Sequence, residues 1–465
     1  MGWGKAIPHG NGGGGSGRFK QFHDPELSIW QSVVDEVAAQ RTAGAQVQDV
    51  GGARAVTGRP DVPDPMSAEA IAYANQVTSG QTVLEATASQ PATEGIAQTA
   101  GFCSLTALKL AKAKITGNKQ DEQRYKDELA KFGDCDPFYA EAAAKYAEYF
   151  LAQQKQVPYI MYKNLSDFVI DDPRKLPGKA TVAVIGDWGT GQEAAKQVLK
   201  QIADKNPDVV IHLGDIYYAG TQFEITKYFL QIWKQILNLG DNLDRIPTFS
   251  LSGNHDMYSG GVAYYQLVQQ LGQPASYFCL RNADWQFIAL DTGYHDHNPS
   301  GGGEGATYLQ DTEVTWLTDK VQNAGGRRTI LMSHHQLFTA FDSIDNNEVN
   351  LRLYPQVAPV LPHVSYWVWG HEHDFVVYNS YRGLARSCCL GHGAFPVGID
   401  ELAKEPKYPD VPVVKDDDGN FLRVGTTGGL YNHGYAIIEL DGSSGQASYY
   451  QDSDEDTPMY THSLT

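Results

Sequence analysis

The chain has 465 residues, of which 42% are hydrophobic and 20% charged, an ordinary balance for a globular protein with a sizeable core. The formal net charge of -19 argues against binding of duplex DNA or RNA, because proteins that grip nucleic acids carry basic patches. No long apolar run and no signal-peptide pattern occurs, so we expect neither membrane insertion nor a secretion signal. The 5 cysteines lack metal-ligand spacing and favour reduced thiols, which agrees with a cytosolic setting.

The N-terminal part of the chain has two segments that differ in composition. Residues 1–22 are rich in glycine and have the composition of a flexible tail. Residues 23–175 are predicted to form a mainly helical domain or subdomain, because apolar residues recur at helical spacing between Asp24 and about Lys155. Within this region, residues 41–65 are rich in Gly and Pro and are predicted as a loop.

From residue 176 the sequence alternates between strand-like and helix-like runs. TVAVI (181–185) is typical of a buried strand, and helical periodicity follows at 192–206 and again at 224–237. This alternation predicts an α/β catalytic domain over residues 176–450, followed by a surface tail over residues 451–465. Further strands are predicted at 208–213, 246–251, 285–290, 328–333, 365–370, 434–440 and 446–451.

Five short blocks of polar residues occur where predicted strands end. They are GDWG (186–189), GDIYY (214–218), GNHD (253–256), SHH (333–335) and GHEH (370–373). Ligands of open α/β sheets bind beyond the carboxyl ends of strands, so we expect the sheet to gather the five blocks at one rim. Each block alone is a weak signal, but the ordered set of carboxylates, amide and imidazoles predicts a two-metal phosphoesterase site.

The residue types in these blocks suggest two sets of ligands that share Asp215 as a bridge. Asp187, Tyr218 and one histidine of GHEH could complete the first metal, whereas Asn254, His334 and the other histidine could complete the second. Phenolate and carboxylate oxygens suit a trivalent ion, and an amide with two imidazoles suits a softer divalent one. Two alternatives stay open, which are His335 in place of His334 and, if the register slips, Tyr217 in place of Tyr218.

The blocks resemble those of the calcineurin-like metallophosphoesterase superfamily and, within it, those of the purple acid phosphatases. The resemblance depends on the aspartate-x-glycine pattern that ends at Gly189 and on the tyrosine three residues after Asp215. It implies an α/β fold, namely a four-layer α/β/β/α sandwich of mixed sheets. It also implies Fe(III) bound by Asp187, Asp215, Tyr218 and His373, and a divalent Fe, Zn or Mn ion bound by Asp215, Asn254, His334 and His371.

The same resemblance implies the reaction. It predicts a phosphatase that hydrolyses small phosphate monoesters by in-line attack of metal-bound hydroxide, in which His255 protonates the leaving oxygen and Asp256 orients His255. The alternatives are a phosphodiesterase acting on nucleotides or lipid head groups, and a phosphate-binding module without turnover. No partner beyond the phosphate ester is predicted.

The chain departs from the plant enzymes of this family at two places. Those enzymes have histidines downstream of the SHH-type ligand that help to bind phosphate, whereas here the stretch TAFDSIDNNE (339–348) has none. The histidines that remain as candidates for contact with the substrate are His295, His297, His335 and His392. The N-terminal region also does not resemble the β-sandwich domain that precedes the catalytic domain of the larger plant enzymes.

Overall fold

The structure is a computed structural model that describes residues 158–217, 220–240, 242–257, 260–296, 306–399 and 402–465, together with strands β1 (Gln46–Val50) and β2 (Ala53–Thr57). The Gly-rich tail and the helices predicted between Asp24 and Lys155 lie outside these residues. β1 and β2 pair antiparallel, with Val50 opposite Ala53. The loop predicted over residues 41–65 therefore contains a hairpin, because two β-branched runs flank a Gly-Gly pair that suits a tight turn.

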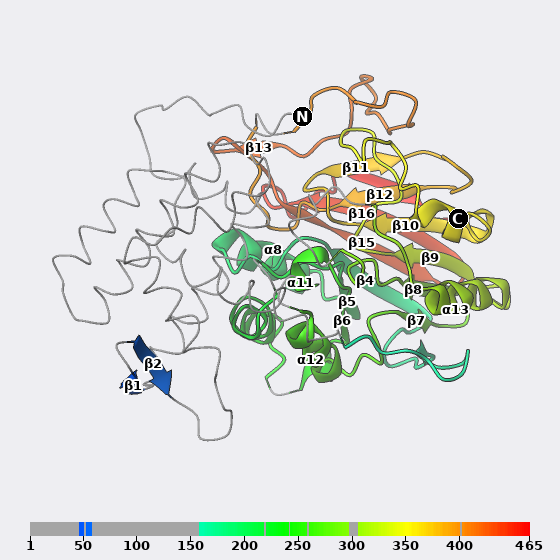
Figure 1. The fold of residues 1–465 in the computed structure, drawn as a ribbon. Coiled ribbons are helices and arrows are strands. Elements are labelled where there is room, and N and C mark those ends of the chain that lie inside the picture. The colour runs from blue at the N-terminus through cyan, green and yellow to red at the C-terminus, as the bar shows by residue number, and fades with distance from the viewer. Residues whose placement is uncertain are drawn as a thin grey trace.

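One mixed sheet has six strands in the order β17-β16-β15-β4-β5-β6 (Figure 1). β4, β5 and β6 run parallel, and the C-terminal strands are added to β4 antiparallel. The strands are β4 (Lys179–Ile185), β5 (Val209–His212), β6 (Thr248–Ser250), β15 (Gly434–Asp441), β16 (Ser444–Gln451) and β17 (Tyr460–Ser463).

A second mixed sheet has seven strands in the order β11-β12-β10-β9-β8-β7-β3. β8, β9, β10 and β12 are parallel to one another. The strands are β3 (Val169–Ile170), β7 (Phe278–Arg281), β8 (Trp285–Ala289), β9 (Arg328–Met332), β10 (Val364–Trp369), β11 (Phe375–Tyr378) and β12 (Ser387–Leu390). A small separate hairpin is made by β13 (Thr426–Thr427) and β14 (Leu430–Tyr431).

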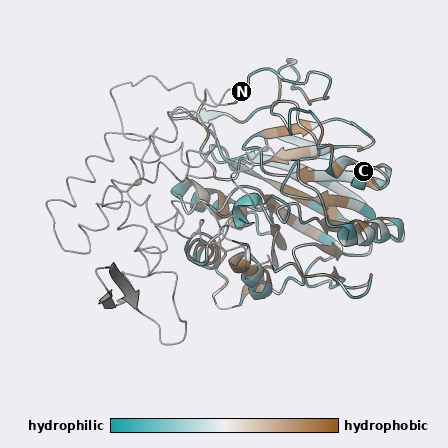
Figure 2. Ribbon diagram, in the orientation of Figure 1, coloured by the Kyte–Doolittle hydropathy of each residue, from teal (hydrophilic) through white to brown (hydrophobic). Residues whose placement is uncertain are grey.

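The two sheets face each other and helices cover their outer faces, as Figures 1 and 2 show. The hydrophobic core between the sheets joins Val182 and Ile211 of one sheet to Phe287 and Val368 of the other. Separate apolar clusters lie on the two outer faces. The expected four-layer α/β/β/α arrangement is therefore confirmed. The covering helices are α8 (Glu193–Asp204), α10 (Gln231–Ile236) and α12 (Val262–Gln270) on one side, and α13 (Asp311–Gln322) and α14 (Leu353–Val357) on the other.

Local sequence explains the first β–α unit of the domain. All of the last four residues of β4 are buried, because this central strand is covered on both faces and is therefore apolar throughout. α8 follows with a buried stripe that includes Val198, Leu199 and Ile202. The helix predicted over 224–237 is formed by α9 (Gln222–Glu224), a π-helical turn η2 (Ile225–Leu230) and α10, and it begins at a capping box between Thr221 and Glu224.

The structure corrects both ends of the predicted catalytic domain. The expected surface tail over 451–465 is wrong in its last part, because β17 extends the six-stranded sheet and alternation places His462 and Leu464 in the interior. Residues 158–175 contribute β3 to the edge of the seven-stranded sheet rather than a helix. No helix within the described part of the chain is long and apolar enough to cross a membrane.

Candidate metal centre

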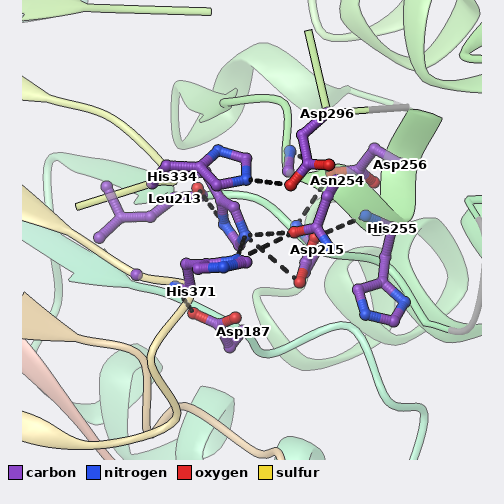
Figure 3. A network of polar contacts seen from close by, with 12 residues as sticks. Asp187, Leu213, Asp215, Asn254, His255, Asp256, Asp296, His334 and His371 are labelled. Atoms are coloured by element: carbon purple, nitrogen blue, oxygen red, sulfur yellow. Dashed lines mark hydrogen bonds and ion pairs between the residues drawn. The ribbon is translucent and has the colours of Figure 1, made fainter. Parts of the chain in front are cut away.

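The five blocks lie at the carboxyl ends of strands from both sheets. Asp187 and Asp215 follow β4 and β5 of the six-stranded sheet, and Asn254 begins the short helix α11 (Asn254–Met257) after β6. His334 and His371 follow β9 and β10 of the seven-stranded sheet. The rim at which the two sheets meet therefore gathers these five predicted ligands, as Figure 3 shows.

Three of these side chains stand on unusual backbone. Asp187, Asp215 and His371 have positive φ angles of 55°, 73° and 68°. The left-handed conformation costs an L-residue about 1–2 kcal/mol, and such residues persist where the surrounding structure holds them, often at functional sites. Each of the three follows a glycine at a strand end, so the chain turns sharply and directs the side chain toward the rim.

The first cluster is made of Asp187, Asp215 and His373, whose potential ligand atoms all lie within 4.8 Å of one another. His373 Nε2 is 3.4 Å from Asp187 Oδ1. The ring of Phe395 stacks on His373 at a centroid distance of 3.5 Å and fixes its plane. Two carboxylates and one imidazole in this space form a donor set that suits a hard metal ion.

A phenol enters the first cluster, and it belongs to Tyr217. The Tyr217 hydroxyl donates to Asp187 Oδ1 at 3.0 Å and is 3.0 Å from His373 Nε2. Burial, followed by the charge of Asp187, raises the pKa of Tyr217 well above its usual value. Tyr218, which the sequence predicts as the ligand, lies outside the described residues and stays a prediction. The sequence offered Tyr217 as a candidate, because it is adjacent to Tyr218. The position of the Tyr217 hydroxyl beside Asp187 and His373 depends on the backbone conformation, which residue spacing does not give.

The second cluster contains His334, His335 and His371, whose potential ligand atoms all lie within 4.8 Å of one another, together with Asn254. His334 Nε2 and His371 Nδ1 lie 3.0 and 3.1 Å from the same amide oxygen, Asn254 Oδ1, and 3.2 Å from each other. His334 Nε2 is also 3.3 Å from Asp215 Oδ2, which connects this cluster to the first. Two ring nitrogens and two oxygens that converge on one point fit a shared cation, so the donor sets suit two ions bridged by Asp215 (Figure 3).

Hydrogen bonds distinguish His334 from its neighbour His335. His334 Nδ1 lies 3.2 Å from the carbonyl oxygen of Leu213, an arrangement that orients a metal-binding histidine and leaves Nε2 for the metal. Both ring nitrogens of His335 have protein partners, namely Thr292 Oγ1 at 3.0 Å and Asp296 Oδ2 at 3.1 Å. His335 therefore belongs to the group of potential ligands but has both ring nitrogens engaged, and the geometry favours His334 as the ligand.

The two clusters form one electrostatic unit. Burial pushes the pKa of Asp215 upward, but His334 and the other nearby imidazoles outweigh it and hold this pKa well below its usual range. Burial likewise opposes protonation of His334, yet Asp215 and Asp187 raise its pKa to about 9. Burial and the neighbouring imidazoles of His335 and His334 hold the pKa of His371 well below its usual value. The rim thus combines the anionic carboxylate of Asp215 with the cationic imidazole of His334, whereas the imidazole of His371 is held neutral.

Close packing explains two glycines of the blocks. A Cβ at Gly189 would lie 2.6 Å from Ile216 Cα, so the aspartate-x-glycine pattern is required where the first two blocks pair through a β-bridge. A Cβ at Gly253 would lie 2.0 Å from Asp215 Oδ1. Both glycines allow the block backbones to approach the bridging carboxylate.

His255 and Asp256 follow Asn254 but perform different tasks. The ring of His255 lies against Tyr217 at a centroid distance of 4.6 Å, and its main-chain N–H donates to Asp215 Oδ1. Asp256 accepts main-chain N–H groups from Gly253, Asp215 and Ile216 at 2.8, 2.9 and 3.2 Å. Its carboxylate therefore ties two blocks together, and burial followed by repulsion from Asp215 raises its pKa to about 8.

The candidate phosphate-binding histidines do not form a group. His297 lies outside the described residues. His295 stacks on Tyr308 at 3.7 Å, and the guanidinium of Arg352 covers the same tyrosine. His392 is buried beside Phe375 and Gly434, and neither ring nitrogen has a hydrogen-bond partner among the described residues. Burial lowers the pKa of His392 to about 3, so its ring is neutral and offers no charge to a phosphate.

Known proteins with similar sequences are phosphoesterases. Tartrate-resistant acid phosphatase type 5 from Homo sapiens is 24% identical over 228 residues, which cover 43% of this chain and 69% of that protein. The 3',5'-cyclic adenosine monophosphate phosphodiesterase CpdA from Escherichia coli is 30% identical over 132 residues, which cover 28% of this chain and 44% of that protein.

Similar solved structures include GAP50, the anchor in the inner membrane complex of Plasmodium, with 14% identity, a TM-score of 0.43, and coverage of 62% of this chain and 89% of that one. A dimetal phosphatase from Danio rerio has 14% identity, a TM-score of 0.38, and coverage of 62% and 98%. The model of the calcineurin-like phosphoesterase family matches residues 180–375, from β4 to the start of β11. Residues 180–375 therefore match the calcineurin-like phosphoesterases, and the two ligand clusters lie at strand ends within this segment.

Proposed function

We propose that the protein is a binuclear metal-dependent phosphatase that hydrolyses phosphate monoesters, in the manner of the purple acid phosphatases. The observation that carries the proposal is the convergence of two donor sets on Asp215, one rich in oxygen and the other rich in imidazole. The similarity to an acid phosphatase over 228 residues supports the monoester reaction. We propose Fe(III) in the first cluster and a divalent Fe, Zn or Mn ion in the second.

In this proposal, Asp187, Asp215, His373 and a tyrosine hold the first ion, whereas Asp215, Asn254, His334 and His371 hold the second. Bound there, the two ions would neutralise phosphate oxygens and lower the pKa of water toward about 7. The protein supplies the geometry: Leu213 orients His334, Phe395 orients His373, and Asp256 fixes the backbone of the bridging block. These contacts fix the donor atoms in advance, so that little reorganisation accompanies the reaction.

His255 is the proposed acid for the leaving group. It is close to the first cluster, since its ring contacts Tyr217 and its main chain contacts Asp215. An imidazole so placed can protonate the departing oxygen of a substrate whose phosphate lies between the two clusters. Asp256, with three main-chain donors on its carboxylate, is better suited to position the loop of His255 than to take part in proton transfer.

The experiment that tests the metal assignment is a visible spectrum with metal analysis, made on protein purified without chelators. A tyrosinate bound to Fe(III) gives a charge-transfer band, and we expect one band and two metal ions per chain. Tyr217→Phe and Tyr218→Phe provide a matched pair of neighbouring variants. Loss of the band in Tyr217→Phe alone would assign the phenol that contacts Asp187 and His373. Loss in Tyr218→Phe alone would support the spacing of the family. A colourless, iron-free but active protein would contradict Fe(III).

A phosphodiesterase is the second candidate, and one observation favours it. The 132 residues that match the cyclic nucleotide phosphodiesterase are 30% identical, a higher identity over a shorter segment than for the acid phosphatase. Parallel assays of p-nitrophenyl phosphate and bis-p-nitrophenyl phosphate separate the two reactions. We expect the monoester to have the higher kcat/KM. A preference for the diester would reverse the assignment, and turnover of neither by metal-loaded protein would leave a phosphate-binding module.

A further inference from the structure

A charged pocket lies outside the five blocks, and two of its lining residues, Arg423 and Tyr431, contact neighbours of the predicted ligand His373. It has a volume of about 530 Å³ and is lined by residues of the segment 404–431, among them Lys404, Glu405, Lys415, Phe421, Arg423 and Tyr431. The segment is drawn in orange at the top of Figure 1, where it lies over the β11 edge of the seven-stranded sheet. Main-chain hydrogen bonds from Val414 to Val377 and from Asn379 to Pro412 attach it to β11.

Two contacts join the pocket wall to the first metal cluster. Arg423 Nη1 donates to Asp374 Oδ2 at 2.7 Å, and Asp374 directly follows the predicted ligand His373. Tyr431 packs against an apolar cluster that contains Tyr217 and Phe395, the two rings in contact with His373. One wall of the pocket is therefore built on residues that adjoin His373, on the side of the first cluster.

The charges in the pocket are suited to an anion. Arg423 is engaged by Asp374 and by the carbonyl oxygen of Ala403, so it builds the wall. Lys404 and Lys415 are exposed, and neither has an ion pair with any described residue. The ammonium group of Lys415 lies 4.6 Å from the centroid of the Phe421 ring. Glu405 is the single acidic side chain of the lining, in a chain whose net charge is -19.

The hairpin that presents Lys415 is held in place by its own turn. Lys415 and Phe421 face each other across a β-bridge, and the carboxylate of Asp416 accepts the main-chain N–H groups of Asp418 and Asn420 at 3.0 and 2.8 Å. The carboxylate of Asp416 is thus used to close the turn, while Asp417 and Asp418 are exposed. Lys415 lies beside an aromatic surface, the ring of Phe421.

We propose that this pocket binds a second anionic group carried by the leaving group of the substrate, and that Lys404 and Lys415 contact it. The inference rests on the proposed phosphatase function and adds a substrate class to it, namely phosphate monoesters with a further carboxylate or phosphate on the alcohol or phenol. Such a group meets two ammonium groups in the pocket, whereas a monoester without it leaves the lysines in water.

Two synthetic peptides test this, acetyl-phosphotyrosine-Glu-Glu-amide and acetyl-phosphotyrosine-Gln-Gln-amide. They have the same leaving phenol and the same length and differ in charge alone. We expect the wild-type kcat/KM to be about fivefold to tenfold higher for the Glu peptide, a factor that reflects modest gains from exposed ion pairs. The double variant Lys404→Gln/Lys415→Gln should lose this preference. Its kcat/KM for p-nitrophenyl phosphate should stay unchanged.

Two controls make the result specific. Lys407→Gln removes a nearby exposed lysine that does not line the pocket, and it should keep the preference. Raising the salt concentration should reduce the wild-type preference, because exposed charge interactions are screened. Equal kcat/KM values for the two peptides in the wild type, or an unchanged preference in the double variant, would overturn the inference while the phosphatase function stands. Absence of p-nitrophenyl phosphate hydrolysis would overturn the function and the inference with it.

Discussion

Two groups of buried carboxylates lie near the same rim, and they ionise in opposite ways. Asp215 in the metal centre faces imidazoles, and its pKa is held well below the usual range. Asp291 and Glu313, behind the GNHD block, are equally buried but face hydroxyl and main-chain N–H groups, and burial raises the pKa of both. The same burial therefore gives a charged site in one place and a proton-holding one in the other.

The contacts of the second group explain the difference. Asp291 accepts the hydroxyl groups of Ser252 and Tyr265, while Glu313 accepts the Asp291 N–H and the Tyr159 hydroxyl, each at 2.9 Å. None of these donors carries a charge, so no positive group among these contacts compensates a carboxylate anion. This acid cluster, Asp291 with Glu313, supports the loop of Ser252 that leads to Asn254. Imidazoles beside Asp215 thus outweigh the effect of burial on its pKa, whereas the uncharged donors around Asp291 and Glu313 do not.

The largest effect is expected from Asp215→Asn, which removes the carboxylate whose pKa is held low by the imidazoles. Asp215 is the proposed bridge between the two clusters, so p-nitrophenyl phosphate hydrolysis should fall by about 10³-fold or more, as for loss of a central stabilising charge. Elemental analysis should find fewer than two metal ions per chain. Asp204→Asn, an exposed residue at the end of α8, is the matched control. Full activity of Asp215→Asn would contradict the bridge.

Two neighbouring substitutions distinguish the proposed metal ligand from a residue that only supports the site. They are His334→Gln and His335→Gln. His334→Gln should lose the second metal and reduce kcat by about 10²-fold or more, because Nε2 faces Asn254 and Asp215. His335→Gln should retain the metal and lose about 10-fold, the lower range for residues that orient a metal site. Metal content and kcat, measured together, check this pair. The opposite order of metal loss would make His335 the ligand.

His255→Asn is expected to have a smaller effect that depends on the leaving group. The imidazole is proposed to protonate the departing oxygen. The kcat for a substrate with a poor alkoxide leaving group should therefore fall by about 10²-fold, whereas the kcat for a substrate that releases p-nitrophenolate should fall much less. The comparison of glycerol phosphate with p-nitrophenyl phosphate measures this difference. Metal content should stay unchanged. An equal loss for both substrates would argue against His255 as the acid.

The smallest effect concerns the acid cluster and is a change in stability with pH. The pKa of Glu313 is higher in the folded state than in the unfolded state. When the pH rises above about 4.5, Glu313 therefore loses its proton in the unfolded state but keeps it in the folded state. The free energy of unfolding then decreases as the pH rises. The slope contributed by one such group is at most about 1.4 kcal/mol per pH unit. The substitution Glu313→Gln removes this contribution to the pH dependence of stability. Denaturant unfolding between about pH 5 and about pH 8 should therefore give a shallower decline for the variant than for the wild type. Identical slopes would contradict a protonated Glu313.

Much of the fold was predictable from local patterns. The runs at 181–185 and 208–213 form β4 and β5 because central parallel strands are apolar on both faces, and this signal survives in sequence alone. β17 was missed because an edge strand has one buried face, so only His462 and Leu464 carry its pattern. The π-helical turn η2 was missed because its apolar spacing does not differ visibly from that of an α-helix.

The candidate ligands were identifiable in the sequence, because the order Asp, Asp, Asn, His, His at strand ends is a local property of the blocks. Which of their atoms meet depends on the fold. It turned Tyr217 toward Asp187, bound both nitrogens of His335 to Thr292 and Asp296, and gave the carboxylate of Asp256 to main-chain amides. These contacts depend on the direction of the backbone and on partners that are distant in the sequence. The spacing of neighbouring residues does not specify either of them.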